Sequence, residues 1–190
     1  MKLVLVRHPL PDVAPGLCYG ASDVPVRADD LAHVHAALAA QGLPGDLPVL
    51  ASPLQRCARL AERLAPGHVT YDARLAEMDF GAWELRAWSG IPRADVDAWT
   101  ADLLHYRPGG AENVLDVARR VHAFIADLRA RALPGVLVVC HAGIIRLLTA
   151  LHDGDPLEHA ALLAARTPHR IGYGEVVMLE NGQPGHPNAV

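Results

Sequence analysis

Three short apolar segments, each followed by a polar or charged side chain, constrain the fold of this chain most strongly. They span residues 2–7, 48–52 and 136–140, and the first and last are continuous runs rich in valine. An apolar run without polar alternation is typical of a strand that is buried on both faces of a parallel sheet. The sequence therefore predicts a sheet whose strands lie between two layers of helices.

Helical periodicity follows each of these segments. Apolar residues recur at i, i+3 and i+7 from Leu31, and a second apolar stripe begins at Leu54. The strongest pattern runs from Asn113, a natural N-cap, to about Arg131. A fourth helix is expected to begin near Gly143. Strands that alternate with helices indicate an α/β fold.

The chain is expected to form one domain. A length of 190 residues is enough for one sizeable core and too short for two comfortable domains. Residues 171–179 predict one more strand or a short hairpin, so the domain should span residues 1–180. The Gly- and Pro-rich residues 181–190 are expected to form a loose tail. The predicted fold class is thus a single-domain, three-layer α/β/α structure with a mainly parallel sheet.

Charge and cysteine content exclude several classes of protein. The formal net charge of −4 argues against a general nucleic-acid or anionic-membrane binder. No segment approaches the roughly 20 apolar residues that a membrane span requires. Cys18, Cys57 and Cys140 are odd in number and form no C-x-x-C pair, which indicates neither a disulfide framework nor a zinc site. We therefore expect a cytoplasmic protein without nucleic-acid or membrane partners, and the sequence leaves its oligomeric state open.

Basic side chains gather where the predicted strands end. Arg7 and His8 follow the first strand, Ser52 and Arg56 follow the second, and His141 follows the third. In open α/β sheets, ligands bind outside the carboxyl ends of the strands. Arginine provides forked, permanently charged donors for phosphate, and a strand-to-helix turn adds backbone N–H groups. This edge of the sheet is therefore predicted to bind a phosphate group.

Four motifs in the chain resemble, in order and spacing, those of the histidine-phosphatase, or phosphoglycerate-mutase-like, superfamily. The resemblance covers the chain from Lys2 to about Thr149. Any one of the motifs is weak, but four in register are strong. They are Leu-Val-Arg7-His8, Ser52-Pro53-Leu-Gln-Arg56, Leu75-Ala-Glu77-Met-Asp-Phe80-Gly81-Ala-Trp83-Glu84 and Val138-Val-Cys-His141-Ala-Gly143.

The resemblance implies a phosphoglycerate-mutase-like fold and a phosphomonoesterase acting on a small phosphorylated metabolite. It assigns His8 as the nucleophile that accepts the phosphoryl group. Arg7, Arg56 and His141 would hold the phosphoryl oxygens and stabilise their charge. This mechanism requires neither a metal ion nor another cofactor, and no metal-ligand set is visible in the sequence.

The general acid is less sharply defined than the nucleophile. The motif assigns Glu77 as the acid for the leaving alcohol and then as the base for water, which predicts that its side chain is partly buried. Asp79 and Glu84 lie close in the sequence and are the alternatives.

The outer part of the site shows both a departure and a branch signal. The superfamily usually has glycine after the nucleophilic histidine, whereas this chain has Pro9, which removes one backbone N–H donor. Residues 16–25 are similar to the α-ribazole phosphatase-like branch, which would place Tyr19 near the substrate and suggests α-ribazole 5'-phosphate. The outer pocket is expected to use residues 16–23 and 82–112, where three tryptophans could line the pocket or serve packing.

Three other functions fit parts of the sequence. A mutase could return the phosphoryl group to its substrate, although the compact chain favours hydrolysis. A non-catalytic phosphate-binding module would need no nucleophile or acid. Cys140 and Arg146 also satisfy the C-x5-R pattern of cysteine-dependent phosphatases, but that assignment leaves His8 and Glu77 without a role.

Overall fold

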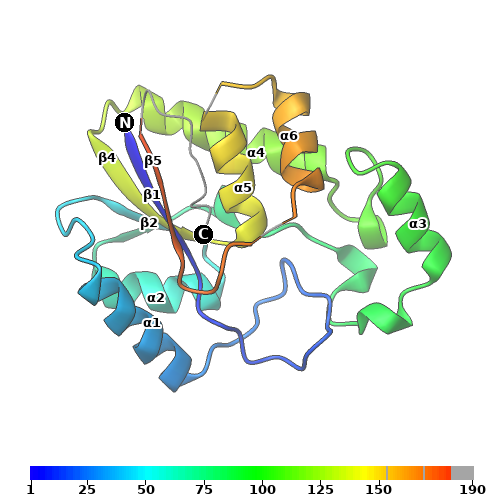
Figure 1. Ribbon diagram of the computed structural model, residues 1–190, viewed down its shortest axis with the longest axis horizontal. Coiled ribbons are helices and arrows are strands. Elements are labelled where there is room, and N and C mark those ends of the chain that lie inside the picture. Colours follow the sequence, from blue (N-terminus) through cyan, green and yellow to red (C-terminus); the bar gives the residue numbers. More distant parts are fainter. Residues whose placement is uncertain (153, 169, 181–190) are drawn as a thin grey trace.

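A five-stranded mixed sheet forms the centre of the computed structural model, which describes residues 1–152, 154–168 and 170–180 (Figure 1). Its strand order is β3-β2-β4-β1-β5, with β5 antiparallel to β1 and the other neighbouring pairs parallel. The strands are β1 (Lys2–Arg7), β2 (Val49–Ala51), β3 (Val69–Tyr71), β4 (Gly135–Cys140) and β5 (Val176–Leu179).

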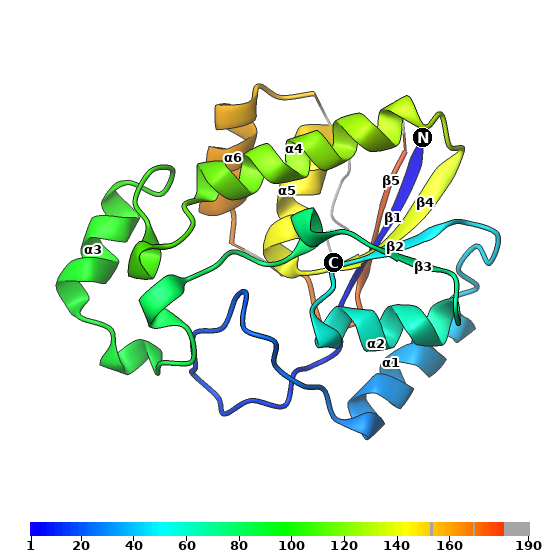
Figure 2. The ribbon, with the colours of Figure 1, turned by 180° about the vertical axis from the view of Figure 1, so that it is seen from behind.

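Helices cover both faces of the sheet (Figures 1 and 2). One face carries α1 (Ala28–Ala40) and α2 (Gln55–Leu64). The other face carries α4 (Val114–Ala130), α5 (Ala142–His152) and α6 (Leu157–Arg166). Side chains of β1 alternate between the two cores: Val4 and Val6 pack towards α1 and α2, and Leu3 and Leu5 pack towards the other helices. The predicted three-layer α/β/α architecture with a mainly parallel sheet is confirmed.

The helix predicted from residue 113 shows how local sequence and tertiary packing agree. Asn113 caps α4 by accepting from the Asp116 backbone N–H at 2.8 Å, and the Asp116 side chain accepts in return from the backbone of Asn113. The apolar stripe of α4 is buried against the sheet. A capping box followed by an amphipathic stripe is a strong helix signal, so both ends of this element could be placed from the sequence.

Three elements were not predicted from the sequence. β3 has three residues and is mostly exposed, and α3 (Arg93–Ala101) has no buried residue. α6 buries only alanines, at positions 160, 161 and 164. Small or exposed side chains give a weak hydrophobic period, and therefore a weak signal. No helix in the part of the chain that the structure describes is long and apolar enough to cross a membrane. The tail expected at residues 181–190 lies outside that part.

Residues 72–113 form an extension beside the sheet rather than a regular layer. This segment contains α3 and four single-turn 3-10 helices, and it lies at the side of the molecule in Figure 1. Cys18, Trp83 and Ile91 form a small separate apolar cluster there. A β-bridge between Leu17 and Ala87 ties the loop that follows β1 to this extension.

The register of the parallel strands brings three polar residues together. Arg7 at the end of β1 lies opposite Cys140, and Ala51 at the end of β2 lies opposite Val139. The residues that follow these ends are His8, Ser52 and His141, so all three emerge at the same edge of the sheet. This is the edge at which the sequence predicts a phosphate site.

Candidate active site

His8 is held in one tautomer by its own chain neighbour. Its Nδ1 lies 2.7 Å from the Pro9 carbonyl oxygen, which can only accept, so Nδ1 carries the proton and Nε2 keeps a lone pair. The side chain is 3% exposed. Burial, together with the positive charges of Arg56 and Arg7, lowers the pKa of His8 from 6.5 to about 3. The imidazole is therefore neutral at neutral pH, with one nitrogen available for attack. Pro9 offers no N–H, but its carbonyl orients the ring.

His141 and Arg56 form a second buried group beside His8. Arg56 donates from Nε to His141 Nδ1 at 3.3 Å, which leaves the proton of His141 on Nε2, 2.9 Å from Ser52 Oγ. The rings of His8 and His141 lie 5.1 Å apart between centroids. Burial, together with the positive charge of Arg56, keeps the pKa of His141 well below its ordinary value. Both histidines are therefore neutral, and the fixed positive charge comes from arginine.

Arg7 is the second arginine beside His8. It donates from Nη1 to the Ile171 carbonyl, and its guanidinium lies 3.9 Å from the centroid of the Tyr173 ring. Its Nε is buried and has no hydrogen-bond partner among the described residues. Tyr173 also lies 5.6 Å from the His8 ring and 3.1 Å, between hydroxyls, from Tyr19. The two tyrosines thus lie beside Arg7 and His8.

Glu84 organises the loop that holds Arg56. Its carboxylate accepts from the backbone N–H groups of Gly20, Ala21, Ser22 and Phe80 and from the Ser22 hydroxyl. The carbonyls of Gly20 and Ser22 in turn accept from the fully buried guanidinium of Arg56. Burial alone would raise the pKa of Glu84, but these hydrogen bonds outweigh it and lower the pKa. A carboxylate so fully engaged is a poor general acid.

Glu77 lies at the opposite side of the group, at the start of α5. Its carboxylate accepts from the Gly143 and Met78 backbone N–H groups, both at 3.1 Å. A Cβ at position 143 would lie 2.5 Å from Glu77 Oε1, so the glycine allows the Glu77 carboxylate to lie close to the backbone of α5. Arg120 of α4 fixes the backbone of this segment by donating to the carbonyls of Arg74, Ala76 and Glu77. Glu77 is partly buried, as expected.

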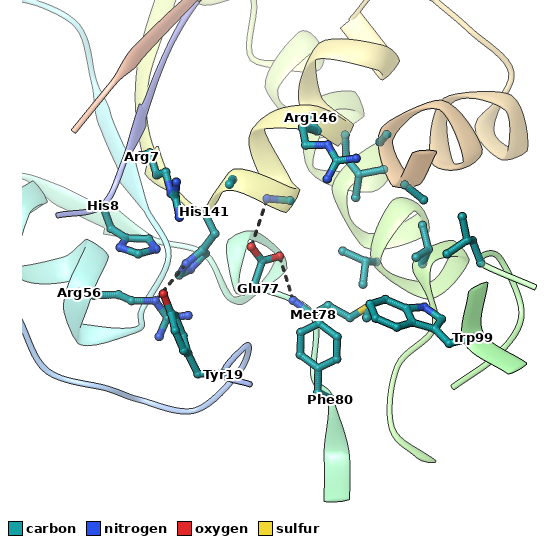
Figure 3. Close-up of a pocket in the computed structure, with 18 of the residues that line it drawn as sticks. Arg7, His8, Tyr19, Arg56, Glu77, Met78, Phe80, Trp99, His141 and Arg146 are labelled. Carbon is teal, nitrogen blue, oxygen red and sulfur yellow. Dashed lines mark hydrogen bonds between the residues drawn. The ribbon is translucent and has the colours of Figure 1, made fainter. Parts of the chain in front are cut away.

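Five of the side chains described above line one pocket of about 380 Å³ (Figure 3): Arg7, His8, Arg56, Glu77 and His141. Within the described part of the chain, Glu77 is the only acidic residue in its lining, and neither Asp79 nor Glu84 reaches it. Tyr19 lines the pocket as expected. Trp88 and Trp99 line it as well, and their stacked rings lie 6.3 Å apart between centroids. Trp83 is instead buried in the neighbouring cluster of Cys18 and Ile91. The pocket thus has a polar end, formed by Arg7, His8, Arg56, Glu77 and His141, and an apolar end, formed by Met78, Phe80, Trp88, Trp99, Leu103, Val114, Val117, Leu147, Ala164 and Ala165.

Two residues to which the sequence gives no role in the site are Tyr173, which lies beside the pocket against Arg7 and His8, and Arg146, which lines it. Tyr173 belongs to an Ile-Gly-Tyr-Gly stretch that was interpreted only as part of a strand or hairpin, and it instead precedes β5. Arg146 was noted only as part of C-x5-R. The thiol of that pattern does not fit a nucleophile: Cys140 is fully buried in β4, and burial raises its pKa well above its ordinary value. Cys140 is therefore the last buried residue of its strand.

Solved structures share this fold and define its class. An α-ribazole phosphatase from Shigella flexneri superposes with a TM-score of 0.79 at 27% identity, covering 97% of this chain and 93% of that chain. A mycobacterial glucosyl-3-phosphoglycerate phosphatase in complex with VO3 gives a TM-score of 0.77 at 25% identity, with coverages of 94% and 92%. The fold is thus that of the phosphoglycerate-mutase-like phosphatases.

Sequence comparison identifies the family. The profile of the histidine phosphatase superfamily (branch 1) matches residues 3–171. An adenosylcobalamin/alpha-ribazole phosphatase from Escherichia coli (strain K12) is 32% identical over 171 residues, which is 83% of this chain and 82% of that protein. The chain belongs to the histidine phosphatase superfamily.

Proposed function

We propose that the protein hydrolyses a small phosphomonoester through a covalent phosphohistidine on His8. One observation carries this proposal: a neutral, buried imidazole with a free Nε2 shares a single pocket with the arginines and the one lining carboxylate. Phosphoryl transfer demands positioning and positive charge around the transferred group, and Arg7 and Arg56 supply that charge.

In the first step, Nε2 of His8 attacks phosphorus while the bond from phosphorus to the leaving oxygen breaks. Arg7 and Arg56 hold the non-bridging oxygens, whose charge is spread in the transition state. His141 donates to one of these oxygens from Nε2, in place of its contact with Ser52 Oγ. Glu77, in its protonated form, donates a proton to the leaving oxygen, so the product leaves as a neutral alcohol. The N–P bond formed leaves His8 as a phosphohistidine.

In the second step, water attacks the phosphohistidine from the side that the alcohol has left. The carboxylate of Glu77, now deprotonated, accepts a proton from that water, and the N–P bond breaks. Inorganic phosphate is released, His8 regains its lone pair, and Glu77 is protonated for the next cycle. The Nδ1–Pro9 bond keeps Nε2 as the reacting nitrogen in both steps.

The substrate that we propose to test first is α-ribazole 5'-phosphate. A curated relative and a solved structure named for this activity support it, and Tyr19 of the branch-like segment lines the pocket. Those relatives are named phosphatases, which favours hydrolysis over mutase-type transfer. We further propose a cytoplasmic location, which fits the three buried free cysteines.

The test combines a substrate panel with trapping of the intermediate. The purified protein, with chelator present, is offered α-ribazole 5'-phosphate, glucosyl-3-phosphoglycerate and 4-nitrophenyl phosphate, and phosphate release is measured. A ³²P-labelled substrate and an alkaline quench should yield a labelled protein whose label survives base and is lost in acid, as expected for phosphohistidine. His8→Ala should carry no label.

Three outcomes would contradict parts of this proposal. Labelled protein that returns its phosphate to an added alcohol faster than to water indicates a mutase. Tight phosphate binding without hydrolysis of any ester indicates a binding module. A label retained in His8→Ala and absent from Cys140→Ser indicates the thiolate mechanism.

A further inference from the structure

Arg146 is a third arginine of the pocket, and the steps above give it no role. It extends from α5 and lies on the far side of Glu77 from His8 (Figure 3). One guanidinium nitrogen, Nη2, donates to the Thr167 carbonyl. Its Nε is buried and has no hydrogen-bond partner among the described residues. Nη1 is not buried and makes no hydrogen bond to the described residues, so the side chain keeps accessible donor capacity at the pocket wall.

Arg146 also lacks a counter-ion within the described part of the chain. No carboxylate there lies within ion-pair distance of it, whereas Arg120 pairs with Glu112 at 2.9 Å and Arg74 with Asp72 at 2.7 Å. The lining carboxylate, Glu77, already accepts from two backbone N–H groups. Arg7 and Arg56, the two arginines of the phosphate end, likewise have no carboxylate partner among the described residues. Arg146 thus resembles the anion-binding arginines in its lack of an ion pair.

The surroundings of Arg146 make an unpaired charge costly. The helix α5 that carries Arg146 packs against α4 and α6, and these three helices contribute the apolar lining residues Val114, Val117, Leu147 and Ala164. Burial lowers the pKa of Arg146 from its ordinary value, and the charge of Glu77 only partly opposes this. An anion that enters such an apolar wall is attracted more strongly than one in water, because less solvent screens the pair.

We propose that Arg146 is an anion subsite for the leaving alcohol. The preferred substrate is then a phosphomonoester whose alcohol has an apolar body and, at its far end, a second anionic group such as a carboxylate. The phosphate occupies the polar end beside His8, the ester oxygen faces Glu77, and the second anion pairs with Arg146. This inference rests on the proposed phosphatase function and names the chemical class of its substrate; α-ribazole, which has no anionic group of its own, would not use this subsite.

Matched aryl esters test this subsite. The probes are 3- and 4-carboxyphenyl phosphate and the corresponding 3- and 4-carbamoylphenyl phosphates, which have nearly the same shape but no second charge. In the parent protein, kcat/KM for at least one carboxylate should exceed that for its amide by about tenfold, the value of one charge-assisted hydrogen-bonded pair. Arg146→Met should abolish this preference and leave kcat/KM for the amide within about threefold.

Two variants separate recognition from a purely structural role. Arg166→Met, at the exposed end of α6, removes a nearby charge outside the pocket and should keep the preference. Arg146→Lys should restore part of it. If Arg146→Met lowers kcat/KM equally for acid and amide, its bond to the Thr167 carbonyl is the only function and the subsite is refuted. An unchanged preference in Arg146→Met refutes it as well.

The alcohol products allow the subsite to be tested separately from turnover. Binding of the 3- and 4-hydroxybenzoates and of the matching hydroxybenzamides is measured by calorimetry. Tighter binding of an acid than of its amide, lost in Arg146→Met, supports the subsite even if no ester is hydrolysed, in which case only the proposed phosphatase function fails. Equal binding of acid and amide overturns the subsite.

Discussion

At the polar end of the pocket three of the five side chains lie at strand ends, whereas the apolar end is formed by an irregular extension and by helix surfaces. Arg7, His8 and His141 emerge from β1 and β4, whose register fixes their separation. Phe80, Trp88 and Trp99 come from the segment 72–113, which contains one short α-helix and single-turn 3-10 helices. The polar end is tied together by hydrogen bonds, while the apolar end is held by ring packing.

Under the proposed mechanism, this difference separates the residues that react from the residues that select the substrate. A phosphoryl group requires the same donors whatever alcohol it carries, so its site gains from strands that cannot shift without breaking the sheet. The leaving alcohol varies between substrates, and an extension with few regular hydrogen bonds can change without disturbing the nucleophile. Changes at the polar end should therefore affect all esters, and changes at the apolar end should affect only those with a suitable alcohol.

The largest effect is expected at His8. His8→Ala should lower kcat by at least about 10³-fold for every ester, because no other group in the pocket replaces the nucleophile. The matched control is Cys140→Ala, which removes the only other proposed nucleophile from a buried strand position and should retain kcat within a few-fold. Initial rates with 4-nitrophenyl phosphate and an alkyl phosphate decide the point, and loss of activity in Cys140→Ala alone would reverse the assignment.

Glu77 should show an effect that depends on the leaving group. Glu77→Gln cannot donate the proton, so turnover of an alkyl phosphate should fall by about 10²–10⁴-fold. The first step with 4-nitrophenyl phosphate should slow less, because its leaving group departs without a proton. Asp79→Asn is the matched control, because that carboxylate accepts from the Gly81 N–H and does not line the pocket. Equal losses for both esters in Glu77→Gln would argue against a general acid.

Glu84 tests whether the hydrogen bonds of the polar end matter for binding. In Glu84→Gln an amide NH₂ faces backbone donors, which should release the loop that holds Arg56 and weaken inorganic phosphate binding by about 10–100-fold. The double variant Arg56→Ala/Glu84→Gln should bind inorganic phosphate only slightly more weakly than Arg56→Ala alone, because both substitutions remove the same contact between Arg56 and its loop. Glu62→Gln, remote from the pocket, is the control. Additive losses in the double variant would show that Glu84 acts independently of Arg56.

The buried neutral His8 predicts a pH dependence of folding. Its folded pKa, about 3, lies below the unfolded value of 6.5, so between these values the unfolded state binds more protons and stability falls as pH falls. Between pH 7 and pH 5 this group lowers the free energy of unfolding by about 2 kcal/mol. His8→Asn should lose about that much less free energy of unfolding over this range. Urea unfolding of both proteins measures these free energies. The difference between parent and variant at pH 8, where His8 is neutral in both states, gives the effect of the substitution on packing alone. Parallel pH profiles of the two proteins would contradict the prediction.

The smallest effect is expected at the apolar end. Trp88→Ala removes one of the aromatic rings that line the apolar end. The KM for an aryl phosphate should therefore rise about three- to fivefold, with kcat retained. KM for glycerol phosphate should not change, since that alcohol does not reach the rings. Met178→Ala, an exposed apolar position on β5, serves as control. A matching rise with glycerol phosphate would mean that the two ends of the pocket are not separable.

Much of the polar end could be predicted from the sequence because its signals are local. The apolar runs that become β1 and β4 end one residue before His8 and His141, and parallel strands bring such ends together. The motif around Glu77 indicated a carboxylate but left Asp79 and Glu84 open. The structure distinguishes them by what each carboxylate contacts: Glu84 binds its loop, Asp79 its own turn, and Glu77 the start of α5.

The sequence by itself determined four of the five strands, the main helices, the buried layers and the basic residues at the sheet edge. Their patterns repeat within a few residues, so local periodicity and the geometry of parallel strands are sufficient. The tertiary structure alone decided that Tyr173 lies over Arg7, that Trp88 stacks on Trp99, and that Arg146 lines the pocket without an ion pair among the described residues. No helical or strand period along the chain predicts these placements, so only packing in three dimensions could reveal them.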